Sequence, residues 1–180
     1  MKARLPHLGV ALAVVAADQA TKWLVRTRLE LHEYHPLVSG VLSLSHVRNR
    51  GAAFGILSDA DLPYQSVLFA ALSLLALGAI AVYASRLPLT AQLPQLALDL
   101  ILGGAIGNLF DRLRYGYVTD FIHVYWREHV WPDFNAADSA ISVGVALLLL
   151  DMLRSSAVAG PQERDAKAQG FGTSPLGRTD

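Results

Sequence analysis

Residues 137–153 read ADSAISVGVALLLLDML, an apolar run with an acidic residue, Asp138, near its start and a second, Asp151, near its end. A helix needs about 20 mostly apolar residues to cross a bilayer, and this run approaches that length. Three further segments do the same, at 8–25, 64–84 and 93–109. With 53% hydrophobic and 17% charged residues, the chain is too apolar for an ordinary soluble domain. The sequence therefore predicts an all-α integral membrane protein with four transmembrane helices.

Four spans place both termini on one side of the membrane. Arginine and lysine residues flank the spans on both sides, so the positive-inside rule leaves the orientation open. The first span also begins like a secretory signal, because Lys2 and Arg4 precede an apolar run that reaches Ala17. Residues 18–25 carry this segment on to spanning length, and three more apolar segments follow, which favours a retained first helix over a cleaved signal.

The loop between the first two spans, residues 26–63, is too long for a simple connector. Near its centre, side chains in residues 40–47 alternate in polarity as in a β-strand, which places Leu42, Leu44 and His46 on one face. We expect a small β-sheet here, on the membrane surface.

The other connections are simpler. Residues 85–90 are short and contain Pro88, which is typical of an antiparallel helical hairpin. After Arg154 the sequence changes to Ser, Gly, Pro and mixed charge, with too little apolar surface to fold. A membrane domain is expected over residues 1–154 and a flexible tail over residues 155–180.

Composition excludes several chemistries. The formal net charge is zero, so nothing in the charge balance indicates a nucleic-acid partner. The chain contains no cysteine, which excludes disulfides, thiolate nucleophiles and cysteine-based zinc sites. Carboxylates, hydroxyls, histidines and lysines remain as candidate catalytic groups.

Two aspartates are the leading candidates. Asp120 comes just after the third span and Asp138 opens the fourth, so antiparallel helices place both at one membrane surface. Two carboxyls that share a proton can activate water while polarising a scissile carbonyl, with no metal or cofactor. The alternative is structural: Asp138 would stabilise a helix N-terminus capped by Asn135, and Asp120 would hydrogen-bond its own turn.

Other polar residues could surround these carboxyls. Asn108 and Arg112 lie one turn apart and could point donors toward the site, while Asp111 could pair with an arginine. Asp18 and Lys22 are also four residues apart, and could simply neutralise each other.

Glycines mark two further segments. Gly103 and Gly107 allow close contact between helices. Residues 48–55 read RNRGAAFG, which could bind an extended peptide through backbone hydrogen bonds or could be a turn before the second helix.

In order, these segments resemble the signature blocks of lipoprotein signal peptidase, also called signal peptidase II. The blocks are DQxxK at 18–22, NxGxxFG at 49–55, GGAxGNxxDR at 103–112, GxVxDF at 116–121 and FNxAD at 134–138. Each block alone is weakly specific, whereas the ordered set, across about Val10 to Leu153, is highly specific.

The resemblance implies an aspartic peptidase of the bacterial cytoplasmic membrane, with cytoplasmic termini and an active site near the extracytoplasmic face. It implies that Asp120 and Asp138 form the catalytic dyad. The residues implied to bind substrate are Asn49, Gly51, Gly104, Asn108, Arg112, Asn135 and Ala137. The remaining motif residues, with an expected structural role, are Asp18, Lys22, Phe54 and Asp111.

The implied substrate is a prolipoprotein whose cysteine bears a diacylglyceryl group, cut on the N-terminal side of that cysteine. Membrane phospholipids are the other expected partners, and the chain is expected to act as a monomer without nucleic acid, metal or cofactor.

Two alternatives stay open from the residues alone. A small proton-coupled transporter would use acidic residues at graded depths, including Asp99, as a proton relay. A membrane scaffold without catalytic activity would tolerate conservative changes at both Asp120 and Asp138.

Overall fold

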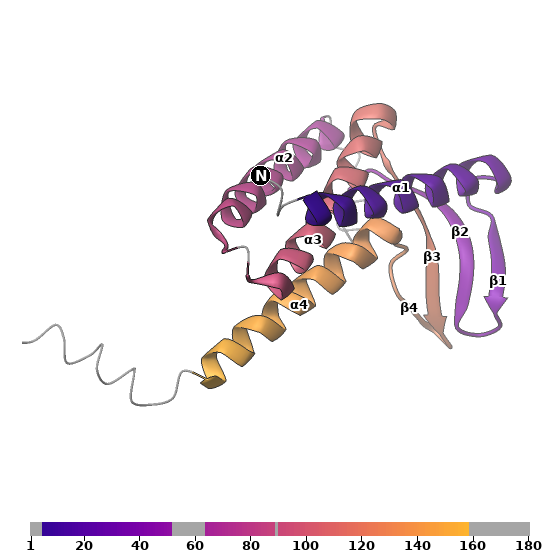
Figure 1. Ribbon diagram of the computed structural model, residues 1–180. Helices are drawn as coiled ribbons and strands as arrows, with labels where there is room; N and C mark the ends of the chain where they lie inside the picture. Colours follow the sequence, from indigo (N-terminus) through magenta and orange to yellow (C-terminus); the bar gives the residue numbers. More distant parts are fainter. Residues whose placement is uncertain (1–4, 52–63, 89, 159–180) are drawn as a thin grey trace, which may run out of the picture.

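The computed structural model describes residues 5–51, 64–88 and 90–158. It is a helical protein with a small antiparallel β-sheet at one end (Figure 1). The helices are α1 (Leu5–Arg28), α2 (Gln65–Arg86), α3 (Gln92–Tyr115) and α4 (Ala136–Val158). The strands are β1 (Tyr34–Val38), β2 (Leu42–Asn49), β3 (Val118–Trp126) and β4 (His129–Val130). The predicted helical architecture with a small sheet is confirmed.

Helix α3 is central, because it packs against α1, α2 and α4. Two adjacent glycines allow these close approaches. A Cβ added at Gly103 would lie 2.7 Å from the backbone oxygen of Ala11 in α1, and one at Gly104 would lie 2.4 Å from that of Ala137 in α4. Both distances are shorter than any van der Waals contact, so the helix crossings require glycine. The structure thus confirms that small residues bring the helices together at Gly103 and Gly107 as predicted, and it shows the same at Gly104.

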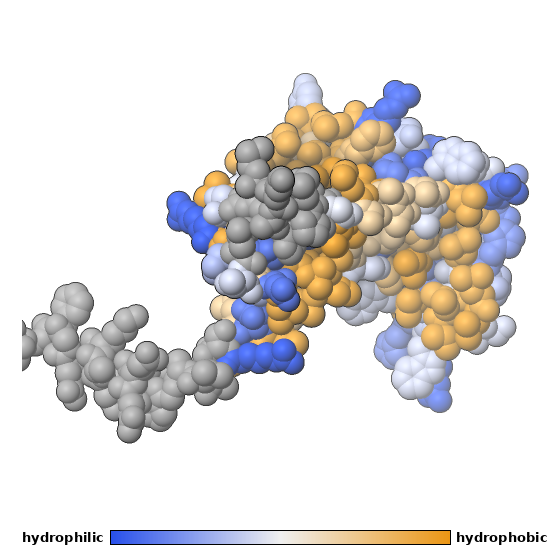
Figure 2. All heavy atoms as spheres, viewed as in Figure 1, coloured by the Kyte–Doolittle hydropathy of each residue, from blue (hydrophilic) through white to orange (hydrophobic). Residues whose placement is uncertain are grey.

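Among the described residues, three helical segments are long and apolar enough to cross a membrane: Val67–Arg86, Gln92–Tyr115 and Ala136–Arg154. Helix α1 is not among them, and its C-terminal half carries Asp18, Lys22, Arg26 and Arg28. Helix α2 exposes a row of large apolar side chains, including Val67, Leu68, Leu72 and Leu75. Figure 2 shows apolar residues over much of the helical part of the viewed face, as a lipid-facing surface requires.

Helices α3 and α4 extend beyond their predicted ends. Helix α3 continues to Tyr115, and Gly116 ends it in the left-handed conformation with its N–H bonded to the Arg112 carbonyl. Helix α4 continues to Val158, four residues past Arg154, the predicted end of the membrane domain. Residues 159–180 of that predicted tail lie outside the described residues.

The sheet has the strand order β1-β2-β3-β4. The sequence predicted a strand at residues 40–47, close to β2, but gave no indication of β3. The predicted single face of Leu42, Leu44 and His46 is interrupted, because the β2–β3 register shifts between Leu44 and Val47. Beyond this bulge Val47 is paired with Asp120, so the sheet places Asp120 beside the end of β2.

Candidate active site

Asn135 connects the two candidate catalytic acids. Asp120 lies near the start of β3 and Asp138 lies in the first turn of α4. The Asn135 amide donates to Oδ1 of Asp120 at 2.7 Å, and its backbone N–H donates to Oδ2 of Asp138 at 3.2 Å. The backbone N–H of Asp138 donates back to Oδ1 of Asn135 at 3.0 Å. The two acids therefore share one hydrogen-bonding residue, and helix capping and pairing of the acids occur together.

Two further amides complete the hydrogen bonding of the carboxyls. Asn49, at the end of β2, donates to Oδ2 of Asp120 at 2.9 Å. Asn108, in α3, donates to Oδ1 of Asp138 at 2.8 Å. Each carboxyl oxygen thus accepts one described hydrogen bond, while exposure of the two residues is only 2% for Asp120 and 7% for Asp138.

Burial changes the acidity of Asp120. Burial, and then the negative charge of Asp138, raise the pKa of Asp120 to about 7, although hydrogen bonds from Asn49 and Asn135 oppose the rise. Near neutral pH a substantial fraction of this carboxyl therefore retains a proton that an exposed aspartate would lose. Two close acids, one protonated, match the requirement for activating water.

Arg112 links α3 to the chain after β2. Its Nη2 donates to the carbonyl oxygen of Gly51 at 3.1 Å, and the Gly51 N–H donates to Oδ1 of Asn49 at 2.8 Å. Arg112 therefore holds the segment that carries Asn49 against the helical bundle. The Arg112 guanidinium is also attracted electrostatically to both acids.

Next to the two acids, the charged side chains of Asp18, Lys22 and Asp111 are buried in contact with one another. The Lys22 ammonium contacts Asp18 at 2.8 Å and Asp111 at 3.2 Å, and donates to Oδ1 of Asn108 at 2.8 Å. Oδ1 of Asp18 accepts the backbone N–H of Ala137 at 3.0 Å, beside Asp138. The predicted Asp18–Lys22 pair is confirmed, but it is part of a larger network.

Asp111 pairs with an arginine, as predicted. Nη1 of Arg26 lies 3.5 Å from Oδ1 of Asp111 and donates to the Thr119 hydroxyl at 3.0 Å. The Thr119 backbone N–H donates to Oδ2 of Asp111 at 3.1 Å. Sequence reasoning did not select Arg26 or Thr119 as site residues; the position of Thr119 next to Asp120 was the available signal.

The other predicted site residues have distinct environments. Gly104 and Ala137 face each other where α3 crosses α4, and their predicted substrate role stays a prediction. Phe54 lies outside the described residues. Among those described, no group of three or more His, Cys, Asp or Glu side chains could hold a metal ion.

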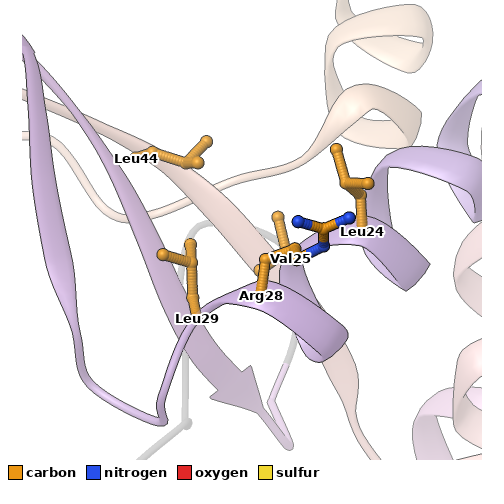
Figure 3. A pocket seen from close by; sticks show the side chains of 5 residues that line it. All are labelled: Leu24, Val25, Arg28, Leu29 and Leu44. Carbon is orange, nitrogen blue, oxygen red and sulfur yellow. The ribbon is translucent and has the colours of Figure 1, made fainter.

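An apolar cavity lies elsewhere, between the end of α1 and β2. Its volume is about 290 Å³, and Figure 3 shows its walls, formed by Leu24, Val25, Arg28, Leu29 and Leu44. Neither candidate acid lines it.

The fold is that of a bacterial membrane enzyme. A bacterial membrane enzyme solved by the in meso method at 2.3 Å resolution aligns with a TM-score of 0.76 and 28% sequence identity, covering 87% of this chain and 92% of that one. A second, solved in the same way at 1.9 Å resolution, aligns with a TM-score of 0.72 and 26% identity, covering 82% of this chain and 92% of that one.

Within that class, the chain belongs to the signal peptidase II family, whose model matches residues 10–154, and it is therefore a peptidase. Lipoprotein signal peptidase from Geobacter metallireducens is 48% identical over 86% of this chain and 94% of its own length. The lipoprotein signal peptidase from Nitratidesulfovibrio vulgaris is 44% identical over 82% of this chain and 88% of its own length.

Proposed function

We propose that this chain is an aspartic endopeptidase that removes signal peptides from diacylglyceryl-modified prolipoproteins, on the N-terminal side of the lipidated cysteine. One observation carries the aspartic assignment: Asp120 and Asp138 are buried and joined through Asn135, at hydrogen-bond distances of 2.7 and 3.2 Å. Its relatives are lipoprotein signal peptidases, which supports the choice of substrate.

The two carboxyls take different roles in this mechanism. Asp138 accepts hydrogen bonds from the Asn108 amide and the Asn135 backbone at the N-terminus of α4, which stabilises an anion and suits it as the base. Asp120, whose pKa is raised to about 7, holds the proton. Asp138 takes a proton from water as the water oxygen attacks the scissile carbonyl, and Asp120 gives its proton to the carbonyl oxygen. The resulting gem-diol breaks the C–N bond as Asp138 returns a proton to the departing amine and the diol returns one to Asp120.

The proposed membrane arrangement has four spans, with α1 as the first and both termini cytoplasmic. The sheet and the acids would then lie at the extracytoplasmic surface, where a lipid-anchored substrate presents its scissile bond. Helix α1 buries Asp18 and Lys22 against α3 and α4, so these two ionised residues face protein rather than lipid. The membrane domain would extend over residues 1–154 and act as a monomer.

Substrate contacts are proposed for the polar groups around the acids. Arg112 and Gly51 lie together beside Asn49, where an extended peptide could receive side-chain and backbone hydrogen bonds. The membership in a peptidase family does not favour the transporter alternative. Among the described residues, Asp18, Asp111, Asp120 and Asp138 belong to one connected group, which supports a single site for these four acids.

The test is cleavage of a diacylglyceryl-modified prolipoprotein by purified wild-type protein, Asp120→Asn and Asp138→Asn. Each substitution should lower kcat at least about 1,000-fold, because no general acid–base pair remains. Asp151→Asn, also on α4, is the matched control and should retain wild-type activity. Near wild-type turnover by either folded dyad variant would contradict the aspartic mechanism.

A further inference from the structure

Lys22 has three hydrogen-bonding partners within a fully buried site. An ammonium group has three N–H donors and no acceptor. In this structure the donors are directed at Asp18, Asp111 and Asn108, and Lys22 is 0% exposed. The first two contacts are ion pairs, but the third is made to a neutral amide.

Charge neutralisation does not account for that third contact. Asp18 and Asp111 carry two negative charges, and Lys22 and Arg26 carry two positive ones, so the group is balanced without Asn108. The contact instead fixes which way the Asn108 amide points, because its oxygen accepts hydrogen bonds and its nitrogen donates them.

The orientation of the Asn108 amide follows from its neighbours. Lys22 can only donate, so Oδ1 of Asn108 must face it, and the amide nitrogen then faces Asp138 at 2.8 Å. Oδ1 of Asn108 also accepts from the Asn135 amide at 3.2 Å, whose nitrogen in turn donates to Asp120. The buried ammonium therefore sets the direction of the Asn108 amide, with its nitrogen toward Asp138, while the Asn135 amide is also fixed by the Asp138 N–H that donates to its Oδ1.

Lys22 has a second connection to the same helix turn. Asp18 contacts Lys22 through Oδ2 and the backbone N–H of Ala137 through Oδ1. The ion pair thus also fixes the first turn of α4, next to Asp138.

We propose that Lys22 is a positioning residue for peptide hydrolysis, which orients the Asn108 amide so that Asp138 receives a hydrogen bond in its anionic, basic form. This proposal rests on the proposed function. Without Lys22, Asn108 can rotate and present its oxygen to Asp138. The anion then loses a donor and faces a lone pair instead, which opposes its role as base.

The experiment measures kcat, KM and the pH profile of prolipoprotein cleavage for Lys22→Met in the full-length chain. We expect kcat to fall roughly 10- to 100-fold, as when a residue that orients a reacting group is lost, with KM within about twofold of wild type. The acid limb of the kcat profile should move to higher pH, because the carboxylate pair is less well stabilised as an anion.

The double variant Lys22→Met/Asp111→Asn separates orientation from charge. It removes one positive and one negative charge, so the group stays balanced and the burial of an unpaired acid is avoided. We expect it to show the same loss of kcat and the same movement of the acid limb. Asp111→Asn alone, which keeps Lys22 and Asn108, is the reference for the double variant, because the two variants share the loss of the acid and differ only in the ammonium.

A folded double variant with the kcat and pH profile of Asp111→Asn would overturn the proposal. This result is distinguishable from failure of the aspartic mechanism, which would appear as cleavage by Asp120→Asn or Asp138→Asn.

Discussion

At the scale of single residues, Asn135 uses all of its polar groups. Its side chain binds Asp120, Asn108 and the backbone of Asp138, its N–H binds the Asp138 carboxyl, and its carbonyl accepts from Ser139. The same residue thus caps α4 and aligns the acids. Any substitution there is expected to change helix stability and chemistry together, which makes Asn135 a poor probe of either alone.

The raised pKa of Asp120 predicts how stability depends on pH. From its ordinary value of 3.8 up to about 7, the folded state keeps a proton that the unfolded state has released. Stability from this group is therefore complete below pH 3.8 and is lost as pH rises through about 7. Asp120→Asn does not titrate, so its stability relative to wild type should improve with rising pH, by at most about 4 kcal/mol.

Denaturation in detergent at about pH 5 and about pH 8 measures this difference. Asp151→Asn serves as the control and should follow the wild-type dependence. If the free energy of unfolding of wild type and of Asp120→Asn changed equally between the two pH values, Asp120 would not hold the proton.

Much of the residue-level chemistry could be predicted, because ionisable groups in apolar segments need partners. Asp18 and Lys22 pair at helical spacing, as expected. The contact between Lys22 and Asn108 could not be predicted, because it joins positions far apart in the chain through the α1–α3 crossing.

At the scale of elements, helix packing and strand pairing were unequally predictable. Apolar runs indicated all four helices, although the end of α3 was placed too early because polar residues follow Leu109. Strand β3 was missed because its first four residues, Val118 to Phe121, are all buried and do not alternate. Its position depends on pairing with β2, which is a long-range property.

Two glycines in the α3–α4 crossing give a matched pair of substitutions. A Cβ at Gly104 would meet the Ala137 backbone at 2.4 Å, and one at Gly144 would meet the Ala97 backbone at 2.6 Å. Alanine at either site should destabilise the protein by about 1–3 kcal/mol, since backbone atoms cannot move aside. Only Gly104→Ala displaces the turn that carries Asp138, so it should also lower kcat.

Thermal unfolding and cleavage assays on the two variants test this difference. Gly78→Ala in α2 is the control, because nothing lies within 4 Å of the added Cβ and alanine favours a helix. Equal loss of kcat in Gly104→Ala and Gly144→Ala would indicate a general loss of packing instead.

At the scale of the whole molecule, one end of the bundle is polar and connected, while the helix surfaces are apolar. The acids, amides and charged group join α1, α3 and α4 to the sheet, whereas α2 exposes Val67, Leu72 and Leu75. This distribution suits a catalytic site at one membrane surface with lipid around the helices.

The proposed orientation can be tested by cysteine labelling, because the chain has no cysteine of its own. Leu37→Cys lies on exposed β1, and Thr90→Cys lies in the exposed link between α2 and α3. A membrane-impermeant maleimide applied to spheroplasts should label position 37 directly and position 90 only after permeabilisation. Labelling of both positions in intact spheroplasts would contradict the four-span arrangement.

The acids and their hydrogen-bonding partners come from α1, β2, α3, β3 and the start of α4. Because a ribosome makes the chain from its N-terminus, every nascent form that ends before residue 138 lacks Asp138, including those that already contain Asp120. On the proposed aspartic mechanism, hydrolytic competence therefore arises only once the start of α4 is made, so shorter nascent forms cannot cleave neighbouring membrane proteins.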